Sequence, residues 1–100
     1  MRLGIPVITT GYGGQRDFCN NENSWLIDFE FKLSSSHFNQ DLSFWAEPSC
    51  THLGYLMRHL FKLSKSDVRK KTQIAKHQLN SFTWDKVGSE NIDFAKKLLN

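Results

Sequence analysis

Residues 4–18 read Gly-Ile-Pro-Val-Ile-Thr-Thr-Gly-Tyr-Gly-Gly-Gln-Arg-Asp-Phe, and this stretch decides the fold that the sequence predicts. Pro6–Thr10 is largely β-branched and apolar on both faces, which is typical of a buried parallel strand. The glycine cluster after it lets the backbone turn tightly and approach a ligand without interference from a Cβ atom. Because ligands of open α/β folds bind outside the carboxyl ends of strands, the stretch predicts an α/β fold with a ligand site there.

The rest of the chain predicts a strand, a long loop and three helices. Trp25–Ile27 is the second short strand, and residues 29–44 are expected to form the loop because they lack a sustained hydrophobic period. Ser49, Ser64 and Thr83 stand where the N-caps of three successive helices are expected. The apolar residues expected to be buried recur at helical spacing: Leu53, Leu56, Met57, Leu60 and Phe61, then Val68, Ile74, Ala75, Leu79 and Phe82, then Val87, Phe94, Ala95 and Leu98.

Length and composition limit the classes of protein. One hundred residues allow one small domain, and 39% of them are apolar. No apolar run approaches the ~18 residues of a membrane span, and the N-terminus lacks the layout of a signal peptide. Cys19 and Cys50 are too few for a disulfide framework, so a reduced, cytoplasmic setting is expected. A net charge of +3 favours sugar nucleotides or a lipid surface as partners, although lysines on solvated faces explain it equally well.

Four segments, in this order, resemble one family. Gly4–Asp17 is similar to its Gly-x-Pro-Val strand and Gly-Gly-x-x-(Glu/Asp) loop, and Asn23–Ile27 resembles its next strand. Trp45–Pro48 matches a tetrapeptide found ahead of a helix, and Phe82–Trp84 resembles the opening of a late helix. The family is that of retaining glycosyltransferases with two Rossmann-like domains, the GT-B architecture, and the matching part is their C-terminal, nucleotide-sugar-binding domain.

The resemblance implies a partial Rossmann-like domain spanning residues 1–100. In such enzymes an acceptor hydroxyl attacks the anomeric carbon of the donor while the diphosphate leaves, and no metal or other cofactor is normally needed. The family's pair of glutamates would lie upstream of Met1, so a truncated or excised piece is expected, or an internal methionine that serves as a start codon. We therefore expect no sugar transfer by the chain alone. A missing N-terminal domain or a second copy is expected as its partner, and a non-catalytic interaction module derived from such an enzyme is the alternative.

Gly13, Gly14 and Asp17 are the candidate donor-binding residues, because the matching loop borders the cleft of the family. The glycines fit a tight strand-to-helix turn equally well, and Asp17 could instead cap the short helix after that turn. No catalytic residue is assigned. Cys50-Thr51-His52 could supply two ligands of a zinc site, but no second Cys/His pair stands at ligand spacing. We therefore expect no metal.

Three other features are weighed against structural roles. Trp45 could stack on a sugar but is expected to anchor the loop, and the Glu47 carboxylate is expected to accept backbone N–H bonds there. The basic residues of the second helix are Arg69, Lys70, Lys71, Lys76 and His77. We expect them to form a solvated face, and because the segment has no nucleic-acid-binding motif we expect no nucleic acid as a partner. A peripheral membrane contact is a further possible partner interaction.

Overall fold

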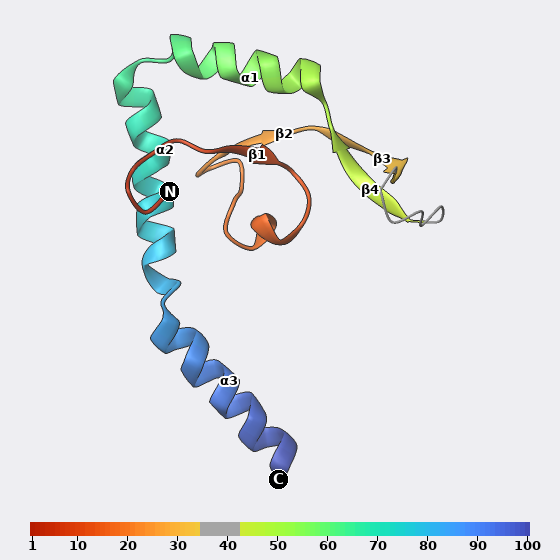
Figure 1. Ribbon diagram of the computed structural model, residues 1–100. Helices are drawn as coiled ribbons and strands as arrows, with labels where there is room; N and C mark the ends of the chain where they lie inside the picture. Colours follow the sequence, from red (N-terminus) through yellow and green to blue (C-terminus); the bar gives the residue numbers. More distant parts are fainter. Residues whose placement is uncertain (35–42) are drawn as a thin grey trace.

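The computed structural model describes residues 1–34 and 43–100, and within them it is a mixed α/β structure. The strands are β1 (Ile8–Thr10), β2 (Trp25–Ile27), β3 (Phe29–Leu33) and β4 (Phe44–Pro48). The helices are α1 (Cys50–Lys62), α2 (Lys65–Gln78) and α3 (Trp84–Leu99), with short 3-10 helices at Gly14–Asp17 and Leu79–Ser81. The order of elements therefore contains the two expected short strands and the three expected helices (Figure 1).

The two expected strands lie side by side and are parallel. Ile8 pairs with Trp25, and Thr10 pairs with Ile27, across β1 and β2. The first strand begins at Ile8 rather than at Pro6. Since Pro6 has no N–H to donate to a neighbouring strand, its exclusion from the ladder has a direct chemical reason. The parallel pairing that the sequence predicts is thus confirmed.

The core lies between α1 and the β1–β2 pair (Figure 1). Trp25 and Ile27 of β2 are buried against Leu56 of α1. The partly buried apolar residues around them come from β1, α1 and the start of α2: Ile8, Leu53, Leu60, Leu63 and Val68. The expected apolar stripe of α1 is therefore only partly buried, because Met57 and Phe61 remain exposed on its flank.

The long loop expected over residues 29–44 is wrong for the described part of that segment. β3 and β4 form an antiparallel pair, with Glu30 opposite Glu47 and Leu33 opposite Phe44. The alternation of Phe29, Phe31 and Leu33 with charged residues is a strand signal of period two, which is too short to stand out beside the helical segments. The middle of the expected loop, residues 35–42, lies outside the described residues.

Aromatic contacts tie this hairpin to the glycine turn after β1. The Tyr12 ring lies 5.2 Å from the Phe29 ring and 5.1 Å from the Phe31 ring, measured between centroids. Trp45 is 46% exposed, so the expectation that it is a buried anchor is wrong. The Glu47 carboxylate has no hydrogen bond within residues 1–34 and 43–100, so its expected role in holding a loop is not found either.

The three helix starts are confirmed by their capping bonds. The hydroxyl oxygens of Ser49, Ser64 and Thr83 each accept a hydrogen bond from the backbone N–H three residues later. In α2, Ala75 is buried and Leu79, which follows its last turn, is buried too, as expected. Ile74 and Phe82 were expected to be buried but are 40% and 47% exposed.

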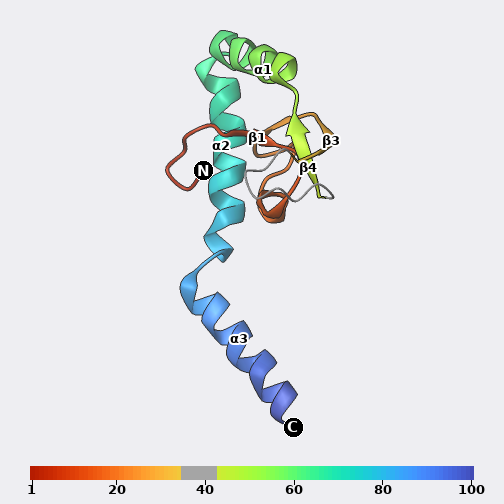
Figure 2. The same cartoon turned by 45° about the vertical axis from the view of Figure 1, so that its right-hand side comes forward.

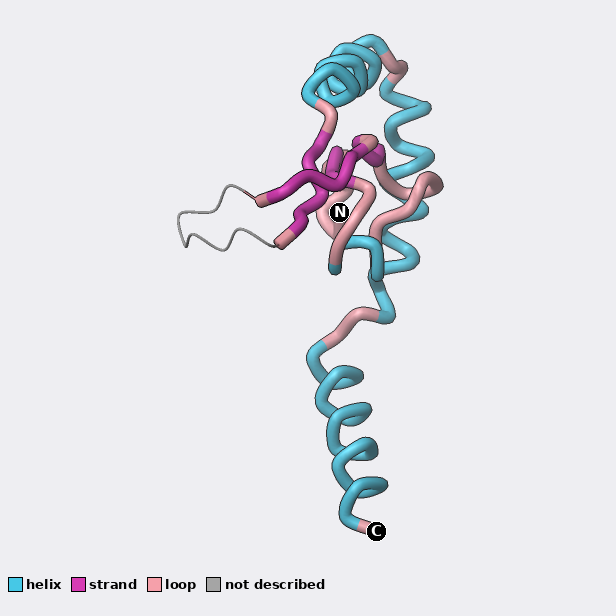
Figure 3. Tube along the Cα trace, turned by 90° about the vertical axis from the view of Figure 1, so that its right-hand side faces the viewer, coloured by secondary structure: helices cyan, strands magenta, loops and turns pink. Residues whose placement is uncertain are grey.

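α3 stands apart from the rest of the molecule. It continues beyond the end of α2 and runs away from the strands, so that the C-terminus lies at the far end (Figures 1, 2 and 3). None of its residues is buried. The radius of gyration is 17.8 Å, whereas a compact domain of this length has about 13 Å. Within the described residues, no helix is both long and apolar enough to cross a membrane.

Candidate functional site

A cleft of about 380 Å³ opens at the carboxyl ends of β1 and β2. Its lining comes from the residues that end or follow the two strands and from the loop between them: Gly11, Arg16, Asn21, Leu26, Ile27, Asp28 and Phe29. Its volume falls within the usual range of ligand pockets. Because both parallel strands end at the same edge, the cleft has the position at which open α/β folds bind ligands.

The glycine turn brings the chain from β1 into this cleft. Gly11 donates its N–H to the Ile27 carbonyl at 2.9 Å, and a Cβ atom at Gly11 would lie 3.3 Å from that carbonyl oxygen. Gly13 has a φ of 103°, which side chains disfavour, and a Cβ atom there would lie 3.0 Å from Oε1 of Gln15. The Gln15 amide in turn donates to the carbonyls of Thr10 and Tyr12. The turn is therefore closed by its own side chain.

The sequence-predicted site residues all lie in this turn and the 3-10 helix after it. Gly13 is the residue that precedes that helix, Gly14 is its first residue and Asp17 is its last. The helix has no side-chain cap, so the alternative role of Asp17 as a cap is not found. The residues of the same segment that line the cleft are Gly11 and Arg16.

Arg16 is the residue that the sequence reasoning passed over. Its side chain is exposed, and its guanidinium has no carboxylate partner within residues 1–34 and 43–100. A guanidinium is always charged and presents a planar fork of N–H donors, so an unpaired one at a cleft suits an anion. An arginine two residues after a glycine pair at the end of a strand was the available signal for it.

A hydrogen-bonded loop carries Asn21, another residue of the cleft lining. The buried amide of Asn23 donates to the Phe18 carbonyl at 2.8 Å and to Oε1 of Gln78 at 2.7 Å. The fully buried hydroxyl of Ser24 donates to the Asn20 carbonyl at 2.7 Å. These bonds fix the backbone on both sides of Asn21, whose own amide is left exposed at the cleft.

Lys71 of α2 also binds this loop. Its ammonium group donates to the Ser24 carbonyl at 3.0 Å and lies 4.7 Å from the centroid of a ring of Trp25. Burial lowers the pKa of Lys71 below its ordinary value. Lys71 therefore belongs to the packing of β2 rather than to the solvated basic face that the sequence predicted for its segment.

Asp28 joins the two sheets and α1. Its backbone N–H donates to Nδ1 of His52 at 2.9 Å, and its carbonyl accepts from the N–H of Ser49 at 2.8 Å. One carboxylate oxygen of Asp28 also lies 3.1 Å from the same imidazole nitrogen. His52 thus fixes the chain where β2 passes into β3, a structural role that its spacing in the sequence did not indicate.

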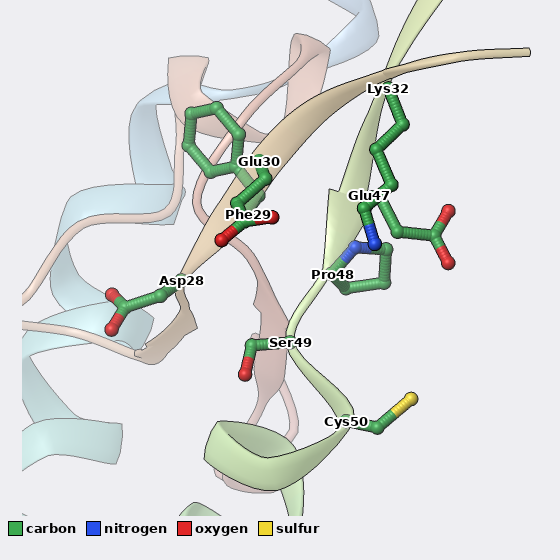
Figure 4. A pocket seen from close by; sticks show the side chains of 8 residues that line it. All are labelled: Asp28, Phe29, Glu30, Lys32, Glu47, Pro48, Ser49 and Cys50. Carbon is green, nitrogen blue, oxygen red and sulfur yellow. The ribbon is translucent and has the colours of Figure 1, made fainter.

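A second, more acidic cleft of about 510 Å³ lies beside the hairpin (Figure 4). It is lined by Asp28, Phe29, Glu30, Lys32, Glu47, Pro48, Ser49 and Cys50. Glu30 and Glu47 stand directly opposite each other across β3 and β4. No group of three or more His, Cys, Asp or Glu side chains in the described part of the chain could hold a metal ion. We assign the candidate site to the first cleft, because it lies at the carboxyl ends of the parallel strands, where open α/β folds bind ligands.

Comparison with known proteins adds no relative of this chain. No protein-family model matches it, and neither a curated protein nor a solved structure matches it at a significant level. Its own fold and cleft therefore define its class. It is a mixed α/β chain with a parallel strand pair, a glycine turn, and a cleft at the carboxyl ends of those strands whose lining includes Arg16.

Proposed function

We propose that the chain forms part of the nucleotide-sugar-binding domain of a retaining glycosyltransferase with two Rossmann-like domains. The observation that carries the proposal is the cleft at the carboxyl ends of β1 and β2, with Arg16 in its lining. A glycine turn after a parallel strand is the usual ligand-binding edge of a Rossmann-like domain. The four ordered segments between Gly4 and Trp84 support the same assignment.

Arg16 suits the diphosphate group of such a donor. Its fork of N–H groups matches two phosphate oxygens, and charge-assisted bonds of this kind are among the strongest that side chains make. The exposed amide of Asn21 adds a donor and an acceptor for sugar hydroxyls. Gly13, Gly14 and Asp17 stay in the proposal as the residues of the turn that carries Arg16. In the implied reaction, a cation beside the departing diphosphate stabilises the charge that develops on it.

The chain is proposed to act with a second, acceptor-binding domain rather than alone. α3 exposes Phe94 and Leu98 by 62% and 71%, which gives such a domain an apolar face to pack against. The same face favours the second candidate function, a non-catalytic module that binds a partner protein. Both cysteines in the chain, Cys19 and Cys50, are free, which suits the reducing cytosol in which we propose that it works.

Titration of the chain with UDP, GDP, ADP and inorganic pyrophosphate tests the proposal, with amide NMR as the readout. We expect the signals of Gly11, Arg16 and Asn21 to shift on binding. The Arg16→Gln variant is expected to weaken pyrophosphate binding roughly tenfold or more, because hydrogen bonds to charged groups contribute about 1.5–3 kcal/mol. The exposed position of Arg16 predicts that this variant folds like the wild type.

Arg2→Gln is the matched control, because it removes the same charge at an exposed position outside the cleft. It is expected to bind nucleotides like the wild type. Equal losses in the two variants, or no nucleotide-dependent shift around the cleft, would show the proposal to be wrong. Recovery of one stoichiometric protein partner without any nucleotide binding would instead favour the interaction module.

A further inference from the structure

The charge of this chain is divided unevenly along its length. Residues 50–78, which hold α1 and α2, contain seven lysine and arginine residues against one acidic residue, Asp67. Residues 1–49 contain three basic and six acidic residues, and residues 79–100 contain three of each. The modest net charge of +3 therefore conceals a strongly basic pair of helices. Such a concentration of one sign makes a local field that attracts an anionic surface.

The basic side chains meet apolar ones where α1 ends and α2 begins. We call this the elbow surface and define it as Met57, Arg58, Phe61, Lys62 and Lys65, all of them exposed. On a helix, residues four apart are neighbours, so Met57 and Phe61 form an apolar row and Arg58 and Lys62 form a basic row beside it. Phe61 is 92% exposed and Met57 is 58% exposed.

The inner side of α1 keeps this surface in place. Leu56 packs into the core with Trp25 and Ile27, and Arg58 follows it by two residues, which is about 200° around the helix. The basic row therefore points away from the strands. In Figure 1, α1 forms one end of the molecule, and the chain turns after it into α2. The elbow surface is thus presented outward by helices that the core already holds.

The cations of the elbow surface are not neutralised by the chain itself. Within residues 1–34 and 43–100, the ion pairs of lysine or arginine involve Lys70 and Lys86, neither of which belongs to this surface. α1 contains no acidic residue at all. The Arg58 guanidinium lies back over Gly54, 3.5 Å from where a Cβ atom would stand. The elbow surface therefore carries three cations without an ion pair beside an exposed phenylalanine.

We propose that the elbow surface docks onto a lipid bilayer that carries anionic headgroups. The basic row meets the lipid phosphates and carboxylates, while Phe61 and Met57 enter the boundary between headgroups and acyl chains. The apolar row favours a bilayer over a duplex nucleic acid, because neither residue can donate or accept a hydrogen bond at a base edge in a groove. The elbow surface shares no residue with the cleft at the strand ends.

α1 and α3 both expose apolar side chains, but they differ in charge. α3 contains three lysines and three acidic residues. Its net charge is therefore zero, and an anionic surface does not attract it. Binding through α3 would therefore be insensitive to anionic lipid. Binding through the elbow surface requires anionic lipid and weakens as salt screens the charges.

Flotation of the full chain with vesicles tests the proposal, because bound protein rises with the lipid while aggregated protein sinks. We expect the chain to float with vesicles of phosphatidylcholine mixed with phosphatidylserine and not with phosphatidylcholine alone. The double variant Arg58→Gln/Lys62→Gln is expected to lower the partition coefficient about fivefold for each charge removed. Phe61→Ser is expected to lower it about tenfold, since its ring leaves water on docking.

The control Lys86→Gln/Lys97→Gln removes two charges from α3 and is expected to float like the wild type. Circular dichroism of each variant shows whether its helices remain, which the exposure of all these residues predicts. Equal losses in the two double variants would overturn the proposal, as would binding that does not depend on phosphatidylserine. It would also fail if the chain bound single-stranded RNA but no vesicles.

Discussion

α1 and α3 have the same kind of amphipathic sequence pattern, but only α1 packs against the core. Each begins with a hydroxyl cap, Ser49 or Thr83, and each places its apolar residues on one side. α1 buries Leu56 and packs two further leucines against the strands. α3 buries nothing, and its last two leucines, Leu98 and Leu99, are 71% and 86% exposed.

The difference lies in what faces each helix. α1 follows β4 directly and is held to the strand pair through Asp28, which accepts a bond from Ser49 and donates one to His52. α3 follows a short 3-10 turn that directs it away from the strands (Figure 2). An amphipathic pattern therefore predicts a helix and the side that seeks burial, but it does not supply the surface that covers that side.

The sharpest way to break this comparison is to remove one leucine from each helix. Leu56→Ala is expected to cost about 2–5 kcal/mol of unfolding free energy, because it leaves a cavity against Trp25 and Ile27. Leu98→Ala is expected to change the unfolding free energy by about 0.5 kcal/mol or less, since its side chain is already exposed. Urea unfolding of both variants, followed by circular dichroism, measures the contrast.

Similar losses in the two variants would contradict the structure, because α3 would then have to be packed in solution. An unfolded Leu56→Ala variant at zero denaturant agrees with the prediction, since few apolar side chains are buried within residues 1–34 and 43–100.

The next effect concerns what covers α3 in solution. We expect the chain to self-associate, because the apolar face of α3 and the second edge of β1 offer surfaces that other copies can cover. Phe94→Ser is expected to weaken that association by about 1.5–3 kcal/mol, the usual contribution of burying one phenylalanine ring. Sedimentation velocity over a range of concentrations measures it, with Lys96→Ser as the matched control on the polar side of α3. A monodisperse monomer with a cooperative melt would refute the prediction.

The smallest expected effect is at the start of α2 and depends on pH. The hydrogen bond from the Ser64 hydroxyl, followed by the hydrogen bond and charge of Lys70, lowers the pKa of Asp67 below its model-peptide value of 3.8. Since the folded-state pKa is the lower one, the stabilisation is fully present above about pH 4 and is lost as the pH falls through the folded-state value.

Asp67→Asn is therefore expected to melt slightly below the wild type near neutral pH, and the difference is expected to shrink in acid. Thermal melts followed by circular dichroism across the acid range check this. A difference that grows as the pH falls would have the wrong sign. The effect is small because Asp67 lies in solvent, where water and salt screen the interaction.

Much of the fold could be predicted from the sequence because its signals are local. The capping hydroxyls and the apolar spacing fixed the helix starts, and the β-branched run before the glycines indicated the parallel strand. The hairpin of β3 and β4 escaped because each strand is only five residues long and the segment between them separates the partners. Its aromatic contacts with Tyr12 depend on pairing that no single window of sequence contains.

The sequence indicated where the cleft lies, but not which residues line it. The turn after β1 does lead into a cleft, as the glycines at its end indicated. Arg16 and Asn21 line that cleft because the 3-10 helix and the loop of residues 20–24 orient them. The arginine after the glycine pair was an available signal, but the sequence does not show that its side chain reaches the cleft. His52 likewise gained its role only when α1 brought it to the N–H of Asp28.

The sequence by itself determined the helices, their caps, the two parallel strands and the glycine turn, because backbone conformation and capping depend on neighbours a few residues away. The tertiary structure alone decided which apolar faces are covered, which side chains reach the cleft and which way the basic row of α1 faces. Those outcomes depend on surfaces that come together from distant parts of the chain, so burial in α1 and exposure in α3 arise from packing rather than from pattern.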